Sequence, residues 1–510
     1  MEVFNDRLLE LVNLYHDLQH NLTWKDVVLY TSVPVITWYT YRLFIQPFLS
    51  PLRKIPGRPF VPIVGNMFEA LRKEAMSNTI EWMLKHNSRF IRFYHLFGAE
   101  RLLVADPELV KYINVTNNAN FQHLQNSSIA RFLPGFVITT VGDEHKSLRR
   151  LLNPVFSRAV VDSFISVFEQ ATKRVIDKWH VELNDNDFCE IEAQQYICRL
   201  GIDAICECGF DYKMNSVSEP HAAGVMSFRR LLVSFRTRLV DMIPFFNRLP
   251  FKDNIQRRED FKFFKKTINN MIAEKKVIMN NTQNEKTHKK NEDILSILLK
   301  ARDDDDKGLS DASLSAQIGG FLFAGFETTS TALTWILLNL AEHENVQDKV
   351  RAEIQQVLPS SDQPLARTDF DKLTYMVCVI NETLRLFPPA TVYFRQSVKD
   401  DTLNGYFIPA KTIIGVSVSG LHRHPDNWEN PDSFIPERFQ EEYDHYKFMP
   451  FGQGPLMCIG KRFAMTEIQT VLTLLLRSFK FHKAPGYKYR RIQNLTMVPD
   501  PPLVLRIEKI

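Results

Sequence analysis

The chain has 510 residues, of which 45% are hydrophobic and 12% aromatic, and its formal net charge at pH 7 is only +4. This length and apolar content can build a large core, either as two domains or as one large domain. The small charge argues against nucleic acid as a partner. The six cysteines form no C-x-x-C pair and are too few for a disulfide scaffold, so they indicate a reducing compartment.

The N-terminal region is predicted to attach the protein to a membrane. Residues 27–46 are mostly apolar and aromatic and are about long enough for a membrane anchor helix, with an interfacial or buried helix as the alternative. Acidic residues prevail before this run and basic residues follow it. The positive-inside rule therefore places residues 1–26 in the lumen as a short N-terminus and the bulk of the chain in the cytosol. A glycosylation sequon at Asn21 falls on the luminal side.

The rest of the chain is predicted to be mainly α with small β-sheets, an α+β class. The proline-rich residues 47–66 should form a stiff hinge, and residues 67–510 should form the folded body. Short β-like pieces occur at 90–94 and 101–104. Ser310 has the position of an N-cap for a long apolar helix that reaches about Leu340. Further helices extend to about Leu386, after which short strands and irregular segments follow.

One cysteine, Cys458, lies in the glycine-rich turn FGQGPLMCIG at residues 451–460. The glycines and Pro455 allow a tight backbone whose N–H groups can turn toward the sulfur. An apolar helical run begins directly afterwards, and a thiolate at a helix N-terminus is favoured by the free N–H groups and the dipole. The turn is thus suited to a thiolate held next to an iron, while a buried and inert cysteine is the alternative.

The long apolar helix contains the motif AGFETT at residues 324–329. A glycine inside a helix costs about 1 kcal/mol relative to alanine, so the motif suggests a local opening where a ligand meets the backbone. Glu327 and Thr328 could relay protons there. The alternative is a loosely packed helix in which a threonine bonds back to a carbonyl.

A third group of polar residues combines acid and guanidinium groups. Glu382 and Arg385 are spaced i, i+3 and share one helix face. Arg438, in the segment FIPERF, could complete a buried network with them. Such a network is tolerated in a protein interior only when its charges are paired and hydrogen-bonded.

Taken in order, these motifs resemble those of the cytochrome P-450 family of haem-thiolate monooxygenases, and its animal and fungal microsomal members most of all. The resemblance covers nearly the whole chain, and the cysteine loop with an upstream E-x-x-R is a specific combination. It implies the cytochrome P-450 fold, a heme b (iron protoporphyrin IX) cofactor in a haem-binding catalytic domain at 67–510, and single-pass residence in the endoplasmic reticulum membrane.

The resemblance also implies a role for each motif residue. A thiolate ligand donates electron density to the iron and favours O–O cleavage. The acid–alcohol pair would deliver protons for oxygen activation. The residues so assigned are Cys458 for the metal; Phe451, Gly452 and Gly460 for cofactor binding; Glu327 and Thr328 for catalysis; and Glu382, Arg385 and Arg438 for a structural triad behind the haem.

Two positions depart from the family pattern. Leu456 stands where the family usually has an arginine or histidine that contacts a haem propionate, and His145 stands where the motif W-x-x-x-R has its tryptophan. Charge-assisted hydrogen bonds contribute about 1.5–3 kcal/mol each. We therefore expect haem retention to depend on Arg149, His145 and Arg395.

The segments that match the family's substrate-contact regions are apolar. The residues expected in the pocket are Phe121, Phe136, Phe321, Ala390 and Val392, with ordinary core packing as the alternative for about half of them. An apolar pocket suits a lipophilic small-molecule substrate. The segment 225–251 matches the family region that lines the entrance and dips into membrane lipid, which is consistent with a substrate that arrives from the bilayer.

The sequence contains no G-x-G-x-x-G motif or flavin site. Electrons from NADPH are therefore expected to arrive through NADPH-cytochrome P-450 reductase, with dioxygen as the second substrate. Basic residues that could meet an acidic partner surface are Lys146, Arg149, Arg150, Lys461 and Arg462. The predicted reaction is hydroxylation or epoxidation. The alternatives are a haem-thiolate isomerase or peroxide-rearranging enzyme, against which Glu327 and Thr328 argue, and a non-catalytic haem-binding protein.

Overall fold

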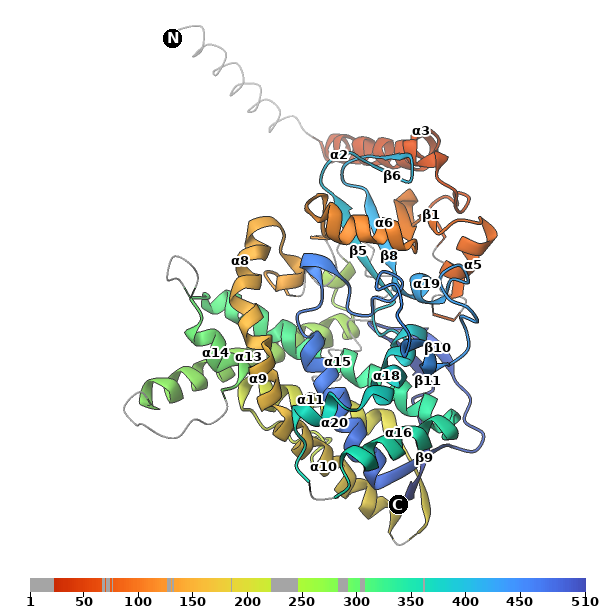
Figure 1. The fold of residues 1–510 in the computed structure, drawn as a ribbon. Coiled ribbons are helices and arrows are strands. Elements are labelled where there is room, and N and C mark those ends of the chain that lie inside the picture. The colour runs from red at the N-terminus through yellow and green to blue at the C-terminus, as the bar shows by residue number, and fades with distance from the viewer. Residues whose placement is uncertain are drawn as a thin grey trace.

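The computed structural model describes residues 23–66, 69, 74–75, 77–125, 130, 133–184, 186–221, 246–282, 292–302, 308–360 and 363–510. Figure 1 shows a large helical part and a smaller part with the main sheet, at whose outer edge the N-terminal helices lie. The class predicted from the sequence, mainly α with small sheets, is confirmed. The predicted luminal segment up to residue 22, with Asn21, and most of the segment 225–251 lie outside the described residues.

Helices account for most of the described chain. Their bounds are α2 (Trp24–Thr40), α3 (Gln46–Leu49), α5 (Ser77–Lys85), α6 (Pro107–Lys111), α8 (Gly142–Leu152), α9 (Arg158–Ser163), α10 (Ile165–Leu183), α11 (Ala193–Phe210), α13 (Lys252–Thr282), α14 (Ile294–Lys300), α15 (Asp311–Glu342), α16 (Glu344–Val357), α17 (Arg367–Phe370), α18 (Thr374–Leu386), α19 (Val418–Arg423) and α20 (Lys461–Ser478).

The largest sheet has five strands in the order β1-β2-β8-β5-β3, with β2 parallel to β8 and the other neighbours antiparallel. Its strands are β1 (Phe90–Tyr94), β2 (Glu100–Val104), β3 (Phe121–His123), β5 (Val392–Ser397) and β8 (Ile413–Ser417). The smaller sheets are β4 (Phe188–Ile191), β12 (Leu505–Lys509) and β9 (Phe479–Lys483), in that order; β6 (Asp401–Leu403) with β7 (Tyr406–Ile408); and β10 (Arg490–Gln493) with β11 (Met497–Asp500).

Helix α15 is the centre of the helical part. The Ser310 side chain caps it by accepting the N–H three residues later, as the sequence predicts. Most of its residues are buried against α11, α13, α18 and α20. Gly201 on α11 permits close packing, because a Cβ atom there would overlap the Ser330 hydroxyl. Taken alone, α15 is the one described helix that is long and apolar enough to cross a membrane, but 78% of its apolar window is buried inside the protein, as in a core helix.

The N-terminal helical region consists of α2, a π-helical turn at Tyr41–Ile45 and α3. Thr23 and Asp26 form a reciprocal capping box at its start. The apolar side chains of α2 are largely exposed, with Tyr30 at 68% and Ile36 at 61%. This stretch coincides with the predicted anchor helix.

The segment predicted as a hinge runs along β1 for much of its length. Ile55 is buried, the Arg58 N–H donates to the Arg92 carbonyl at 2.9 Å, and the Asn66 N–H donates to the Tyr94 carbonyl at 2.8 Å. The helical N-terminus is thereby tied to the edge of the main sheet.

Candidate active site

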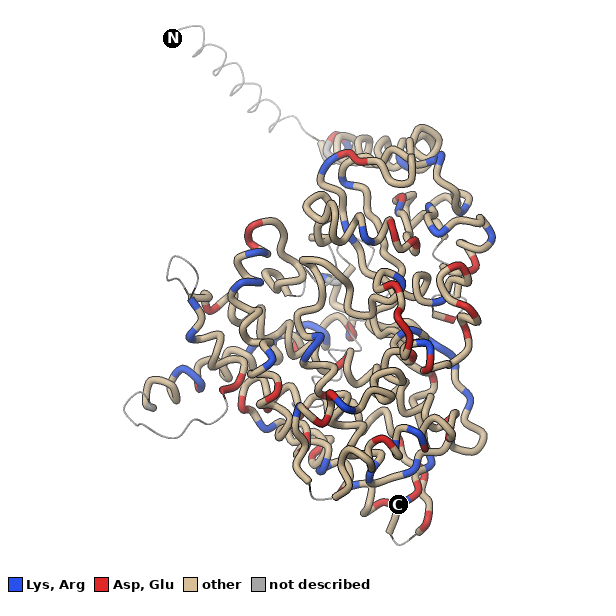
Figure 2. Tube along the Cα trace, viewed as in Figure 1, with Lys and Arg blue, Asp and Glu red and all other residues tan. Residues whose placement is uncertain are grey.

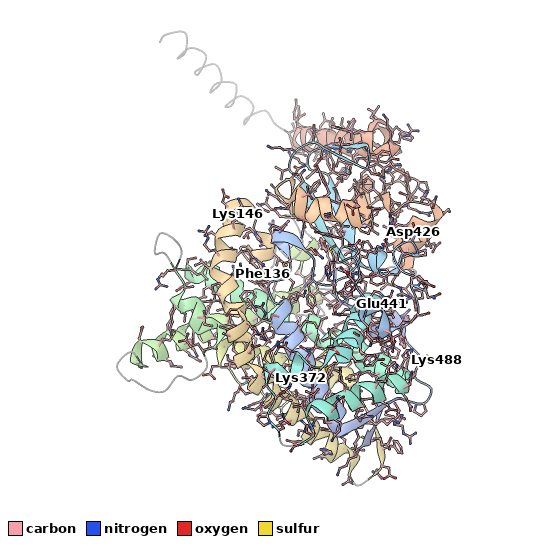
Figure 3. The ribbon with its side chains drawn as sticks, in the orientation of Figure 1. Phe136, Lys146, Lys372, Asp426, Glu441 and Lys488 are labelled. Carbon is pink, nitrogen blue, oxygen red and sulfur yellow. The ribbon has the colours of Figure 1, made fainter. Side chains whose placement is uncertain are left out.

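A cavity of about 490 Å³ lies where α15, the main sheet and the cysteine loop meet. One wall is the segment 321–332 of α15, and the opposite wall is the loop 449–460 with the start of α20. Ala390 and Val392 close it from the β5 side, and Phe136, labelled in Figure 3, closes it from the segment before α8. The Phe136 ring packs edge to face on Phe321, at 5.8 Å between ring centroids.

The loop that carries Cys458 is held by its own backbone. The Cys458 N–H donates to the Phe451 carbonyl at 2.9 Å, and the Met457 N–H donates to the Gly454 carbonyl at 3.1 Å. Gly454 has a φ of 75°, and a Cβ atom there would overlap the Asn114 carbonyl oxygen. Only glycine fits this position, since it tolerates both the left-handed backbone and the close approach.

The sulfur of Cys458 is the chemically distinctive atom of the cavity. Among the six cysteines Cys458 is the one that is exposed, and it lines this cavity. Burial raises the pKa of the thiol, whereas backbone N–H groups of Gly460 and Lys461 and the positive charge of Arg149 act in the opposite direction. These groups would stabilise a thiolate once a cation binds the sulfur.

Four basic side chains gather at the edge of the cavity: His123, His145, Arg149 and Arg395. Arg395 donates to His123 Nδ1 at 3.2 Å. Because a guanidinium can only donate, the proton of the neutral His123 ring must sit on Nε2. The His123 and His145 rings are 5.4 Å apart, and Arg149 donates to the Met457 carbonyl at 3.2 Å.

Among the described residues this basic cluster has no acidic partner. Within the described residues none of its four members forms an ion pair, and Arg395 Nε is buried without a hydrogen-bond partner. Burial and the neighbouring arginines lower the pKa of His123 to about 2 and that of His145 to about 4. Burial also lowers the pKa of Arg395. A protein interior tolerates such an arrangement when an anion completes it.

The residues present fit a haem. Haem needs one protein ligand for the iron, an apolar enclosure for the porphyrin and cations for its two carboxylates. The cavity offers Cys458 as the ligand, a largely apolar lining, and Arg149, Arg395, His123 and His145 as the cationic and hydrogen-bonding edge. Over the described ranges no group of three or more His, Cys, Asp and Glu residues could hold a metal ion.

The structure brings Glu382, Arg385 and Arg438 together, as the sequence suggests. Arg385 donates to both carboxylate oxygens of Glu382, at 2.7 and 2.9 Å, and Arg438 Nε donates to Glu382 Oε1 at 3.1 Å. The other Arg385 donors reach the carbonyls of His422, Pro431 and Ser433. Glu382 and Arg385 are fully buried, yet every donor of Arg385 is satisfied.

This triad is connected to the cysteine loop through His422. Arg385 donates to the His422 carbonyl, and the His422 ring accepts the N–H of Met449 at 2.9 Å. The Met449 carbonyl in turn accepts the N–H of Gly452. Burial lowers the pKa of His422 to about 3, so the ring stays neutral and can accept. The triad therefore helps to position the loop, which motif analysis alone did not reveal.

The predicted catalytic pair faces two different partners. The Thr328 side chain lines the cavity, and its hydroxyl donates to the Ala324 carbonyl at 2.8 Å. Glu327 does not line the cavity; its carboxylate accepts a hydrogen bond of 2.8 Å from the hydroxyl of Thr496, between β10 and β11. Burial raises the pKa of Glu327, and this hydrogen bond opposes the rise.

The positions of the predicted pocket and cofactor residues can be read from the same cavity. Phe136, Phe321, Ala390, Val392, His145, Arg149, Arg395, Phe451, Gly452, Gly460 and Cys458 line it. Phe121 does not line the cavity. It lies on β3, two residues before His123, where it is fully buried in the smaller core cluster and packs on Tyr112. Sequence reasoning missed His123, for which the only signal is its register opposite Arg395.

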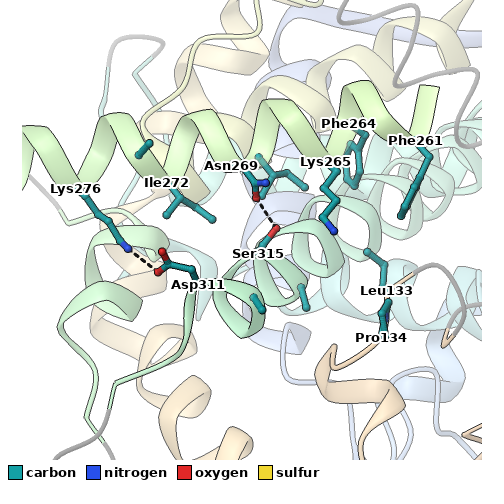
Figure 4. Close-up of a pocket in the computed structure, with 14 residues that line it drawn as sticks. Leu133, Pro134, Phe261, Phe264, Lys265, Asn269, Ile272, Lys276, Asp311 and Ser315 are labelled. Carbon is teal, nitrogen blue, oxygen red and sulfur yellow. Dashed lines mark hydrogen bonds and ion pairs between the residues drawn. The ribbon is translucent and has the colours of Figure 1, made fainter. Parts of the chain in front are cut away.

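A second pocket, of about 700 Å³, lies between α13 and the start of α15 (Figure 4). Four of its polar groups form two pairs: Lys276 with Asp311 at 2.6 Å, and the Ser315 hydroxyl with Asn269 at 3.0 Å. It contains no cysteine and no histidine among its described lining residues. The cavity at Cys458 is therefore the candidate active site.

Comparison with known proteins agrees with this geometry. The family model "Cytochrome P450" matches residues 55–507. Over 95% of this chain and 99% of the relative, the sequence is 28% identical to "Cytochrome P450 4c21" of Blattella germanica. It is 29% identical to "Cytochrome P450 3A15" of Cavia porcellus over 93% of this chain and 95% of the relative. It is 28% identical to "Cytochrome P450 3A7" of Homo sapiens over 96% of this chain and 98% of the relative. The chain therefore belongs to the cytochrome P450 family of haem-thiolate monooxygenases, whose cofactor is heme b.

Proposed function

We propose that this enzyme hydroxylates or epoxidises a lipophilic small molecule with electrons that NADPH supplies through a flavoprotein reductase. The observation that carries the proposal is Cys458, whose sulfur faces a cavity with apolar walls and an edge of unpaired cations. When bound, haem with a thiolate ligand activates dioxygen for insertion of one oxygen atom.

In this proposal different residues have different roles around the cofactor. Cys458 holds the iron, and the N–H groups of Gly460 and Lys461 adjust the charge on its sulfur. Arg149, Arg395, His123 and His145 hold the carboxylates. The apolar side chains of Phe136 and Phe321 limit the access of water to the reacting centre.

Proton supply is assigned to Glu327 and Thr328. A buried carboxyl with a raised pKa binds a proton more readily than a solvated one, and an adjacent hydroxyl can pass one on. The same pair favours a monooxygenase over an isomerase or a peroxide-rearranging enzyme, because those reactions need no protons for oxygen activation. Glu382, Arg385 and Arg438 would have no chemical step of their own.

The substrate class follows from the cavity lining. On the side away from the loop the described residues that line it are almost all apolar, among them Ile205, Ala324, Ala390, Val392 and Val418. Such a surface gains free energy by contact with apolar groups and offers few partners to a polar ligand. We therefore infer a lipophilic substrate.

The reductase would approach from the side of the cysteine loop. Lys146, at the outer surface of α8 in Figure 3, and the exposed Lys461 and Arg462 lie near this loop in sequence or space. Arg149 belongs partly to the basic cluster and is less available to a partner. An electrostatic contact of this kind should weaken as salt is added, so reduction by NADPH and reductase should slow with ionic strength.

We further propose that α2 anchors the enzyme in the endoplasmic reticulum membrane as a single pass, with the catalytic domain in the cytosol. Figure 2 shows that α2 carries few charged residues, and its apolar side chains are exposed over most of its length. In water this surface would be unfavourable, whereas lipid would cover it. Membrane lipid would also be the source of the substrate.

A two-stage experiment tests the function. Lipophilic compounds are first screened for those that shift the spin state of the ferric haem, and the compounds found are then incubated with reductase, NADPH and ¹⁸O₂. A monooxygenase should place one ¹⁸O atom in the product for each NADPH productively used. An isomerase would convert its substrate without NADPH, and a non-catalytic haem protein would give neither result.

A further inference from the structure

The carboxyl of Glu327 is held by a chain of hydroxyl groups that lies outside the cavity. Thr496 Oγ1 donates to Glu327 Oε1 at 2.8 Å, and Thr496 Oγ1 and Thr331 Oγ1 are 3.0 Å apart. Thr331 is four residues after Glu327, so both side chains lie on the same face of α15. Thr496 is 2% and Thr331 4% exposed, so the contact between these two hydroxyls is buried, whereas the contact with Glu327 is half-buried.

The direction of the hydrogen bonds follows from proton counting. A hydroxyl has one proton to donate, and Thr496 uses it on the Glu327 carboxylate. Thr331 must therefore donate to Thr496, and the chain runs from Thr331 through Thr496 to Glu327. Each hydroxyl in it is oriented by the one before.

The turn that carries Thr496 is fixed in place from two sides. The Met497 N–H donates to the Pro389 carbonyl at 3.1 Å, and the Trp335 indole donates to the Met497 carbonyl at 2.7 Å. The Thr391 hydroxyl donates to Gln493 at 2.8 Å. Thr496 is thus held between α15 and the segment after α18, and that segment also lines the cavity.

We propose that Thr496 is a positioning residue for Glu327, and that Thr331 orients Thr496 for this task. Glu327 accepts its hydrogen bond from Thr496, outside the cavity lining, whereas the Thr328 hydroxyl lines the cavity and is bonded to the Ala324 carbonyl. To pass a proton toward the cavity, Glu327 must exchange the Thr496 hydrogen bond for one on the cavity side. The role as proton donor depends on the proposed function, whereas the contact with Thr496 does not.

Loss of the Thr496 hydroxyl should raise the pKa of Glu327. A donor to a carboxylate stabilises its charged form, so its removal disfavours ionisation. The loss of a hydrogen bond to a charged group should move the titration midpoint of Glu327 upward by about one pH unit or more in a Thr496→Val variant. Among the described groups, the ones that set its pKa are its own burial and Thr496, with no charged neighbour.

Infrared difference spectroscopy of the holoenzyme tests the contact without turnover. The C=O stretching band of protonated Glu327 is identified as the band lost in Glu327→Gln. In Thr496→Val this band should shift in frequency and persist to higher pH, and in Thr496→Ser it should stay as in the wild type, because serine keeps the hydroxyl. Thr331→Val should give a smaller shift in the same direction.

Thr334→Val is the matched control. Thr334 is equally buried on α15, but its hydroxyl donates to the Ser330 carbonyl of its own helix. This variant should leave the Glu327 band unchanged. A band that is the same in Thr496→Val and the wild type, or that moves as much in Thr334→Val, would overturn the proposal.

A second readout uses the reductase, NADPH and a substrate found in the spin-state screen. Thr496→Val should release several-fold more hydrogen peroxide per NADPH than the wild type, because the proton donor is no longer positioned. In the Glu327→Gln background the same substitution should have no further effect. Equal effects in both backgrounds would show that Thr496 acts through general packing. The function itself is judged separately, from ¹⁸O incorporation by the wild type.

Discussion

Two groups of buried charges lie close to the cysteine loop. In the triad, Glu382 is bonded by Arg385 and Arg438, and every donor of Arg385 has an acceptor. In the basic cluster, Arg149, Arg395, His123 and His145 have no acid within reach among the described residues, and one Arg395 nitrogen has no partner. Both groups contain arginine in the protein interior, but within the part of the chain that the structure describes only the first has its charges paired.

The difference separates a structural role from a binding role. A buried charge that is fully paired stabilises the folded chain relative to the same chain with one partner removed. A buried charge without a counter-ion is unfavourable for the isolated protein and becomes favourable when a ligand supplies the opposite charge. From this comparison we propose that the triad serves the fold and that the basic cluster binds the haem carboxylates.

The largest effect should come from breaking the triad. Arg385→Met would leave the Glu382 carboxylate buried with Arg438 as its remaining charged partner, and it should cost about 3–5 kcal/mol in the free energy of unfolding. Urea unfolding measures this. The exposed pair of Lys349 and Glu437, at 2.9 Å, is the control, since Lys349→Met should cost less than about 1 kcal/mol. Equal losses in the two variants would contradict the structural role.

Removal of a cation from the basic cluster should have opposite effects on the apoprotein and the holoprotein. Arg395→Met removes an unpaired buried cation, so the apoprotein should be as stable as the wild type or more stable. The holoprotein should lose haem about tenfold faster or more, because a charge-assisted hydrogen bond of about 1.5–3 kcal/mol is lost. Urea unfolding of the apoprotein and haem transfer to apomyoglobin give the two values. If Arg395→Met destabilised the apoprotein and left the rate of haem transfer unchanged, the basic cluster would have a structural role and not a haem-binding role.

A substitution at position 456 should strengthen haem retention instead of weakening it. Leu456 lines the cavity where the family pattern has a cation, so Leu456→Arg should slow haem transfer several-fold. Arg149→Ala should accelerate haem transfer, although by less than Arg395→Met, because one donor of Arg149 is already bonded to the Met457 carbonyl. The same transfer assay measures both. If neither variant changes the rate, the cluster does not hold the carboxylates.

The smallest effect is the pH dependence of the apoprotein. The pKa of His123 is lowered to about 2, so below the ordinary histidine pKa of about 6.5 the unfolded chain binds a proton that the folded chain does not. Folding stability should therefore fall as the pH decreases from about 6.5, by at most about 1.4 kcal/mol per pH unit for this residue. His123→Gln should flatten the curve measured by urea unfolding, and His221→Gln, at an exposed site, should not. A parallel curve for His123→Gln would contradict the burial of a neutral ring.

Local signals in the sequence were sufficient for much of the fold. The Ser310 cap, the continuous apolar pattern of α15 and the helix end near Leu386 each depend on neighbours within a few residues, and the structure confirms them. The E-x-x-R spacing placed Glu382 and Arg385 on one helix face for the same reason.

The remaining features depend on contacts between distant segments. His123 enters the basic cluster only because β3 pairs with β5, and Thr496 meets Glu327 across 169 positions of sequence. Phe121 was expected in the pocket, but β3 places it two residues away from the cavity edge, within the smaller core cluster. No periodicity or motif encodes such pairings, because they are set by sheet register and by the packing of turns on α15.

The central claim is that Cys458 binds the haem iron as a thiolate, and the optical spectrum of the reduced protein with carbon monoxide tests it most directly. The account predicts the long-wavelength Soret band typical of thiolate ligation in the wild type and its loss in Cys458→His, with haem still bound. A wild-type spectrum typical of a histidine-ligated haem, or a thiolate band that survives in Cys458→His, would contradict it.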